Sequence, residues 1–183
     1  MNEVQSVLNN RYFYYVLQGS SLLLADERNK KKFLDFLAEE QQVINLRVHA
    51  FCVTDESIHM VAECASAGIL SWCMENVSAR FMAACQEYLP VVNGNLPWLT
   101  EWENRELEDH SEIAMICRKI HLLPVEYGYT SQPMDYWWSS YLSYMGGYDW
   151  GMLDCNALLL YFSSNVETAR TRMRRFHRKQ SAA

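Results

Sequence analysis

Apolar residues recur at every third or fourth position in three long stretches of the chain, which is the spacing of an amphipathic helix. These stretches predict helices over residues 26–44, 67–88 and 165–179. A shorter helix is predicted from Ile113 to Ile120. It is expected to stop before Pro124, because the residue before a proline avoids helical backbone angles. The last helix is predicted to begin at Ser164, since Glu167 completes the pattern of a capping box.

Shorter runs rich in aromatic and β-branched residues predict strands. One lies within residues 12–24, where YFYYVLQ leads into a turn at Gly19. Two more, at 46–53 and 58–63, are separated by the polar segment TDES and predict a β-hairpin. The acidic stretch 101–112 predicts no helix or strand. The order strand, helix, hairpin, helix predicts an α+β sandwich with helices on one face of an antiparallel sheet.

The composition is that of a folded domain. Half of the 183 residues are hydrophobic and 13% are aromatic, which excludes a disordered or fibrous chain. No repeat and no Pro-, Gly- or Ser-rich linker divides the sequence, so residues 1–183 are predicted to form a single domain. Neither a long apolar run nor a basic and apolar leader is present, so a cytoplasmic protein without a membrane partner is expected.

The six cysteines are scattered along the chain and include no CxxC pair. A cytoplasmic chain with a full core does not need disulfides, so buried free thiols are expected. A zinc site is poorly supported, because no two Cys or His residues fall at the usual ligand spacing.

Charge is distributed unevenly along the chain, which has a net charge of −6. Six of the sixteen Lys and Arg residues lie within 170–179, where no acidic residue occurs. Residues 1–169 therefore hold ten basic and twenty-two acidic residues, a net charge of −12. An acidic body repels a phosphate backbone, whereas a basic end attracts one.

Four segments resemble those of one known family: HAFCVTDESIHMV at 49–61, RKIHLLPVEYG at 118–128, YWWSSY at 136–141 and LLLYFSSNVETARTRMRRF at 158–176. With Trp98, they are similar in kind and register to the REP-associated tyrosine transposases of the HUH single-tyrosine superfamily, over residues 12–179. The resemblance implies a ferredoxin-like antiparallel sheet with helices packed on it, plus extra C-terminal helices. It also implies a relationship to enzymes of DNA transposition, which cut and rejoin single-stranded DNA at the foot of a hairpin. They use a tyrosine nucleophile and a divalent cation held by two histidines.

The residues that carry this chemistry in the family are only partly present here. The first histidine position is Ser57, the second is His59, and Lys119 stands at the position of the nucleophilic tyrosine. A serine hydroxyl is a weak ligand, so loss of the metal site is predicted and no cofactor is expected. His59 is interpreted as a strand-face histidine, and Asp55 and Glu56 as solvated turn residues.

Other family positions have changed as well. Glu101 and Glu126 stand where the family has arginines, and Leu123 where it has an asparagine, so weaker contacts to DNA are expected. Tyr127 and Tyr129 lie close in sequence and are the alternative for a displaced nucleophile. The remaining family residues are interpreted as packing residues that hold the loop after the short helix against the core. They are Trp98, Pro124, Gly128, Trp138, Ser139, Ser140 and Tyr141.

The predicted C-terminal helix holds the candidate contacts to nucleic acid. Its basic residues are Arg170, Arg172, Arg174, Arg175, Arg178 and Lys179. Arg170, Arg174 and Arg178 follow one another at one-turn intervals, away from an apolar side that is predicted to hold Val166, Ala169, Met173 and Phe176.

Three functions remain open from the sequence. The leading one is a transposase-like protein without catalytic activity, retained for DNA binding or regulation, with single-stranded or hairpin DNA as its partner. The second is a protein-interaction module without a DNA role, which the acidic body favours. The third is an active transposase with displaced catalytic residues.

Overall fold

The computed structural model describes residues 10–19, 21–86 and 102–178. Its larger elements follow the chain in the order β1 (Arg11–Gln18), α1 (Ser21–Leu24), α2 (Glu27–Ile44), β2 (Arg47–Val53), β3 (Ser57–Cys64), α3 (Ala67–Cys85), β4 (Trp102–Leu107), α4 (His110–Glu126), α5 (Tyr141–Tyr144), α6 (Asn156–Phe162) and α7 (Val166–Arg178), with a 3-10 turn, η1 (Pro133–Asp135), before α5. The strands form one antiparallel sheet in the order β2-β3-β1-β4. β1, α2, β2, β3, α3 and β4 therefore make the βαββαβ arrangement of a ferredoxin-like fold, as the family resemblance implies.

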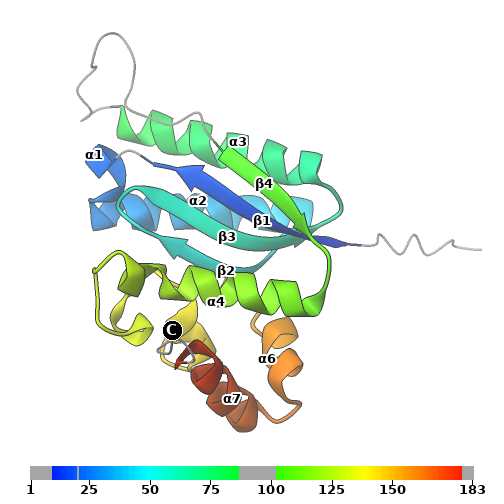
Figure 1. The fold of residues 1–183 in the computed structure, drawn as a ribbon. Coiled ribbons are helices and arrows are strands. Elements are labelled where there is room, and N and C mark those ends of the chain that lie inside the picture. The colour runs from blue at the N-terminus through cyan, green and yellow to red at the C-terminus, as the bar shows by residue number, and fades with distance from the viewer. Residues whose placement is uncertain (1–9, 20, 87–101, 179–183) are drawn as a thin grey trace, which may run out of the picture.

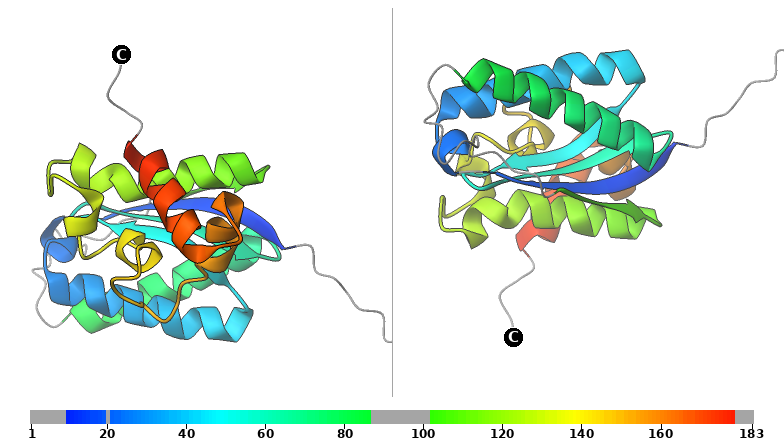
Figure 2. Two further views of the ribbon diagram at one scale, coloured as in Figure 1. Left: turned by 90° about the horizontal axis from the view of Figure 1, so that it is seen from below. Right: turned by 90° about the horizontal axis from the view of Figure 1, so that it is seen from above.

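Helices cover both faces of the sheet. α2 and α3 pack side by side on one face, and α4 crosses the other face over β2 and β3 (Figures 1 and 2). All eight residues of β3 are buried as a result, because a sheet that is covered on both sides has no solvated face. The prediction of helices on one face only is therefore wrong, and α4 supplies the missing cover.

The predicted helices begin and end where local chemistry allows. Asp26 caps α2 by accepting the N–H of Arg28, and Asn45 ends it in the left-handed region at φ 53°. Ser66 caps α3 in the same way through the N–H of Ile69. Phe33 of α2 and Phe81 of α3 meet edge-on, with 5.6 Å between ring centres, so the two helices share one aromatic contact above the sheet.

The YWWSSY segment covers the outer edge of β2. Val53 donates its N–H to the carbonyl of Trp138 (2.9 Å), and Ser140 donates its N–H to the carbonyl of Phe51 (3.0 Å). The Ser140 hydroxyl accepts the N–H of Phe51 at 3.0 Å. Trp138, Ser139, Ser140 and Tyr141 are all buried, so the predicted packing role of these four residues is confirmed. The same prediction is wrong for Gly128, which is exposed, and Trp98 lies outside the described residues.

Several boundaries differ from the sequence predictions. α4 continues through Pro124 to Glu126, since burial of Leu123 and Pro124 against the core offsets the one backbone hydrogen bond that proline removes. The acidic stretch contributes the unpredicted strand β4, and part of the predicted turn after β1 is the short helix α1. Asn165, not Ser164, caps α7, because its side chain accepts the N–H of Thr168.

Two further expectations concern the whole chain. All six cysteines are free thiols and five are buried, as expected. Within the three described ranges, no helix is both long enough and apolar enough to span a membrane.

Candidate nucleic-acid interface

The structure brings Ser57, His59 and Lys119 together on the face of the sheet that α4 covers. Ser57 and His59 are two residues apart on β3, so their side chains point to the same face. The Nδ1 atom of His59 is 2.8 Å from the hydroxyl of Tyr14, and its Nε2 atom is 2.9 Å from the hydroxyl of Ser57. The ammonium of Lys119 lies 5.7 Å from the centre of the Tyr14 ring. Tyr14 therefore lies at the centre of this site, between His59 and Lys119. The sequence analysis gave Tyr14 no role.

The register of the sheet explains the role of Tyr14. Val16 of β1 lies opposite His59, so Tyr14 is the diagonal neighbour of His59 on the same face. A tyrosine can reach across that diagonal, and its ring also stacks near the imidazole, with centres 6.1 Å apart. Strand pairing was the signal that could have identified it, but the register is not visible in either strand alone.

His59 is a neutral imidazole enclosed by protein hydroxyl groups. Burial, and after it the charge of Lys119, lower the pKa of His59 to about 4. Both ring nitrogens already have hydroxyl partners, so binding a cation would require His59 to give one of them up. Across the described parts of the chain, no three His, Cys, Asp or Glu side chains gather in a group that could hold a metal ion. This set of donors does not fit the divalent cation that the family uses.

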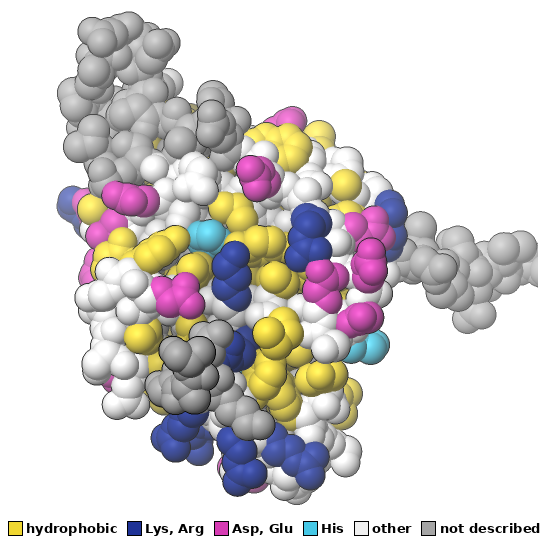
Figure 3. All heavy atoms as spheres, viewed as in Figure 1, with side chains coloured by type: hydrophobic (Ala, Val, Ile, Leu, Met, Phe, Trp, Pro, Cys, Tyr) yellow, Lys and Arg dark blue, Asp and Glu magenta, His cyan; other side chains and the backbone are white. Residues whose placement is uncertain are grey.

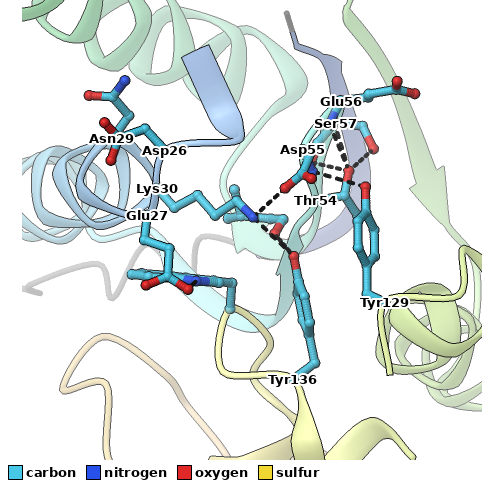
Figure 4. A network of polar contacts seen from close by, with 12 residues as sticks. Asp26, Glu27, Asn29, Lys30, Thr54, Asp55, Glu56, Ser57, Tyr129 and Tyr136 are labelled. Carbon is cyan, nitrogen blue, oxygen red and sulfur yellow. Dashed lines mark hydrogen bonds and ion pairs between the residues drawn. The ribbon is translucent and has the colours of Figure 1, made fainter. Parts of the chain in front are cut away.

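The β2–β3 turn next to Ser57 is held by a buried lysine (Figure 4). Lys30 of α2 is 4% exposed, and its ammonium donates to Asp55 at 2.6 Å and to the hydroxyl of Tyr136 at 3.2 Å. The Tyr136 hydroxyl in turn donates to the carbonyl of Val53 (2.8 Å). Asp55 is a partly solvated residue of the turn, as interpreted, but its carboxylate also pairs with a buried cation, which the sequence did not predict.

The same network reaches Ser57 and Tyr129. Thr54 accepts the N–H of Ser57 at 2.9 Å, and its hydroxyl lies 2.9 Å from the Ser57 hydroxyl. The N–H of Asp55 donates to the Tyr129 hydroxyl at 3.3 Å, and the Tyr129 ring stacks on Tyr136 with centres 5.5 Å apart. Tyr129 therefore supports the turn through its phenol group.

Tyr127 occupies a different position from the one expected. It is the C-terminal cap of α4 and not part of a loop beyond Pro124, and it is half exposed. Burial, and after it Tyr127, raise the pKa of Tyr14 to about 12. Both alternative tyrosines are exposed, Tyr127 (53%) more than Tyr129 (38%).

The arginines of α7 have different roles. Arg170 donates to the carbonyl of Tyr144 at 3.1 Å and Arg172 donates to the carbonyl of Phe162 at 2.7 Å, so both fasten the helix to its neighbours. Arg174 and Arg178 line a cavity between α7 and α4, and Arg175 is exposed. Lys179 lies outside the described residues. The basic side chains of α7 therefore do not form one uniform surface.

The buried side of α7 also differs from the prediction. Ala169 and Met173 are buried as predicted, but Val166 is exposed. His177 is buried instead, with its Nε2 atom 3.0 Å from the Nδ1 atom of His121 on α4. The sequence interpretation missed this pair because the two histidines are 56 positions apart.

Positive and negative side chains gather on different parts of the molecular surface. In Figure 3, Lys and Arg side chains lie together over α7, whereas Asp and Glu side chains gather near β4 and the start of α4. The acidic side chains of this second region are partly paired, for example Glu106 with Arg11 and Glu112 with Arg105. The face that could approach a phosphate backbone is therefore the α4–α7 side.

The fold is similar to that of a solved REP-associated tyrosine transposase bound to a REP hairpin. The TM-score is 0.62 at 15% sequence identity, over 80% of this chain and 87% of that chain. A protein from Deinococcus radiodurans R1 assigned as a transposase matches with a TM-score of 0.46 and 14% identity, over 63% of this chain and 92% of that chain. No family model and no curated protein sequence matches the chain. The first similarity confirms the transposase-like α+β fold that the motifs predict, and at this identity it concerns the fold alone.

Proposed function

We propose that this chain binds single-stranded DNA beside a hairpin and does not cleave it. The observation that carries the proposal is the continuous series of hydrogen bonds from Ser57 through His59 to Tyr14, which uses both ring nitrogens of His59. The exposed Lys119 lies next to it. Cleavage by the family's route needs an ionised tyrosine and a cation at these positions. A neutral imidazole and an ammonium group supply neither, but an ammonium group suits a phosphate that is held and left intact.

Three further arginines offer positive charge on α7. Arg174, Arg175 and Arg178 are exposed, and none of them makes a salt bridge within the described residues. A strand that follows this side avoids the acidic region near β4 and the start of α4. The acidic body is therefore compatible with binding on one face. The solved transposase of similar fold is bound to a REP hairpin, and this proposal assigns hairpin binding to the present chain as well.

We expect no nicking and no covalent protein–DNA adduct when the chain is incubated with labelled hairpin oligonucleotides and magnesium or manganese. The physical reason is that the phenol of the family's nucleophile is absent at Lys119, and His59 is committed to two hydroxyl groups. Denaturing gels and intact-mass spectrometry measure both products. An adduct that maps to Tyr127 and disappears in Tyr127→Phe would contradict the proposal and support a displaced nucleophile.

We expect hairpin binding that weakens steeply with salt. Replacing Arg174, Arg175 and Arg178 by Gln should make the slope of log K against log salt shallower by about 2, at roughly 0.7 for each phosphate contact. Deleting the helix is a poorer test, because Ala169, Met173 and His177 belong to the core. The matched control replaces three basic residues of α2 by Gln: Arg28, Lys31 and Lys32. Lys30 is left out because it is buried. Fluorescence anisotropy at a series of salt concentrations measures the slopes.

The second candidate is a protein-interaction module, which the acidic surface near β4 favours. It predicts that the full chain shows no salt-sensitive binding to any hairpin oligonucleotide at micromolar concentration. If log K falls with log salt equally steeply for the α7 variant and the α2 control, α7 does not contribute phosphate contacts.

A further inference from the structure

A cavity of about 540 Å³ opens between the second half of α4, the segment around η1 and the second half of α7. Small-molecule sites in proteins usually measure about 300–1,000 Å³, so this cavity has the size of one bound ligand. One part of its lining is apolar and includes Leu122, Val125 and Met134. Another part consists of the guanidinium groups of Arg174 and Arg178. A ligand that fits both parts has an apolar body and an anionic end.

The two arginines are placed to hold the same anion. Arg174 and Arg178 are four residues apart on α7, so their side chains lie on one face of the helix. Burial raises the pKa of the Tyr141 hydroxyl, and both guanidinium groups oppose this rise, which shows that both charges lie near this phenol. Tyr141 lines the cavity too. Within the described residues neither arginine has a salt-bridge partner, so the two charges are available to a ligand.

The side of the cavity that α4 forms carries a different polar group. Glu126 belongs to α4, whereas the two arginines belong to α7. A carboxylate accepts hydrogen bonds and repels an anion, so the end of the ligand near Glu126 carries N–H donors. Ser131 and Gln132 add neutral hydrogen-bonding groups at the rim. An anion at one end, an apolar body and an amino group at the other end are features of a nucleotide with an aminated base.

We infer that this cavity binds a single nucleotide whose base carries an exocyclic amino group. The phosphate would lie between Arg174 and Arg178, and the base against Leu122, Val125 and Met134, with its amino group toward Glu126. Such a nucleotide is either free or an unpaired position of a bound strand. In the second case the inference rests on the proposed function and specifies which part of the DNA α7 holds.

Calorimetric titration of the full chain with dCMP, dTMP and inorganic phosphate tests the inference. We expect dCMP to bind more tightly than dTMP, which has no amino group, and more tightly than phosphate. Arg178→Gln should weaken dCMP binding by about tenfold, as for loss of a charge-assisted hydrogen bond. Lys31→Gln is the control, because Lys31 is an exposed basic residue of α2 that lies outside this cavity and outside the proposed DNA contacts of α7. Val125→Trp fills the cavity without changing its charge and should abolish dCMP binding.

Several outcomes would overturn the inference. They are no saturable binding of dCMP at millimolar concentration, equal binding of dCMP and phosphate, equal losses in Arg178→Gln and Lys31→Gln, or unchanged binding in Val125→Trp. A hairpin with one unpaired cytidine, compared with the same hairpin carrying an abasic site there, separates the two sources. Loss of affinity at the abasic site supports the strand as the source. If dCMP binds and no hairpin does, the cavity inference stands for a free nucleotide and the proposed function fails.

Discussion

Lowering the pH from 7 to 5 is expected to reduce the free energy of unfolding by about 2 kcal/mol for each of His59 and His177. Burial is the main cause that lowers the pKa of each imidazole to about 4. In the unfolded chain the same histidines take up protons near their ordinary pKa of about 6.5. The stabilisation is therefore complete above that value and is lost as the pH falls toward the folded-state pKa of about 4.

Burial keeps His177 neutral although its hydrogen bond to the carbonyl of Met173 acts in the opposite direction and raises the pKa. A consistent neutral chain runs from the Ser140 hydroxyl to Nε2 of His121 (2.8 Å), from Nδ1 of His121 to Nε2 of His177 (3.0 Å), and from Nδ1 of His177 to the carbonyl of Met173 (2.8 Å). Burial, and then the neighbouring His177, lower the pKa of His121 well below its ordinary value. Both histidines of this hydrogen-bonded series therefore lower the free energy of unfolding as the pH falls.

Urea unfolding at pH 7, 6 and 5 measures this effect. His59→Gln should remove about 2 kcal/mol of the pH dependence, because its amide does not titrate in either state. His110→Gln is the control for exchanging an imidazole for an amide, since His110 is exposed. A free energy of unfolding that does not change between pH 7 and pH 5 would show that the buried histidines titrate normally.

Replacing Asp55 by Ala is expected to destabilise the fold by about 3 kcal/mol. The change leaves the buried ammonium of Lys30 without its carboxylate, and only the neutral Tyr136 hydroxyl remains within hydrogen-bond distance. The side chain of Lys30 is 5% exposed and that of Asp55 is 35% exposed, so the two partners are not equivalent.

Substitution of the other partner of this ion pair, Lys30, is expected to reduce the free energy of unfolding by less. Lys30→Met removes the buried charge and keeps the apolar stem, and Asp55 is exposed enough to be hydrated by water. The expected loss is below about 1 kcal/mol. Glu56→Ala is the control for the turn, because Glu56 is the exposed neighbour of Asp55. Denaturant unfolding of the three variants measures the order, and a larger loss in Lys30→Met than in Asp55→Ala would contradict this account of the network.

The sequence could predict α2, α3, α7 and the β2–β3 hairpin because each has a complete local signal. Helical spacing, capping residues and a polar turn are properties of neighbours along the chain. β4 has no such signal: WENREL is mostly polar, and the strand exists because its backbone pairs with β1. Pro124 shows the opposite case, in which a correct local rule was overridden by burial of the residues around it.

The motifs of the sequence predicted, through the family resemblance, that Ser57, His59 and Lys119 lie near one another. Only the tertiary structure decided what these residues touch. Tyr14 meets His59 across 45 positions, His121 meets His177 across 56, and Lys30 meets Tyr136 across 106. Such contacts depend on strand register and on the face that each helix covers. No local pattern records either of these, because both arise from the free energy of packing distant segments together.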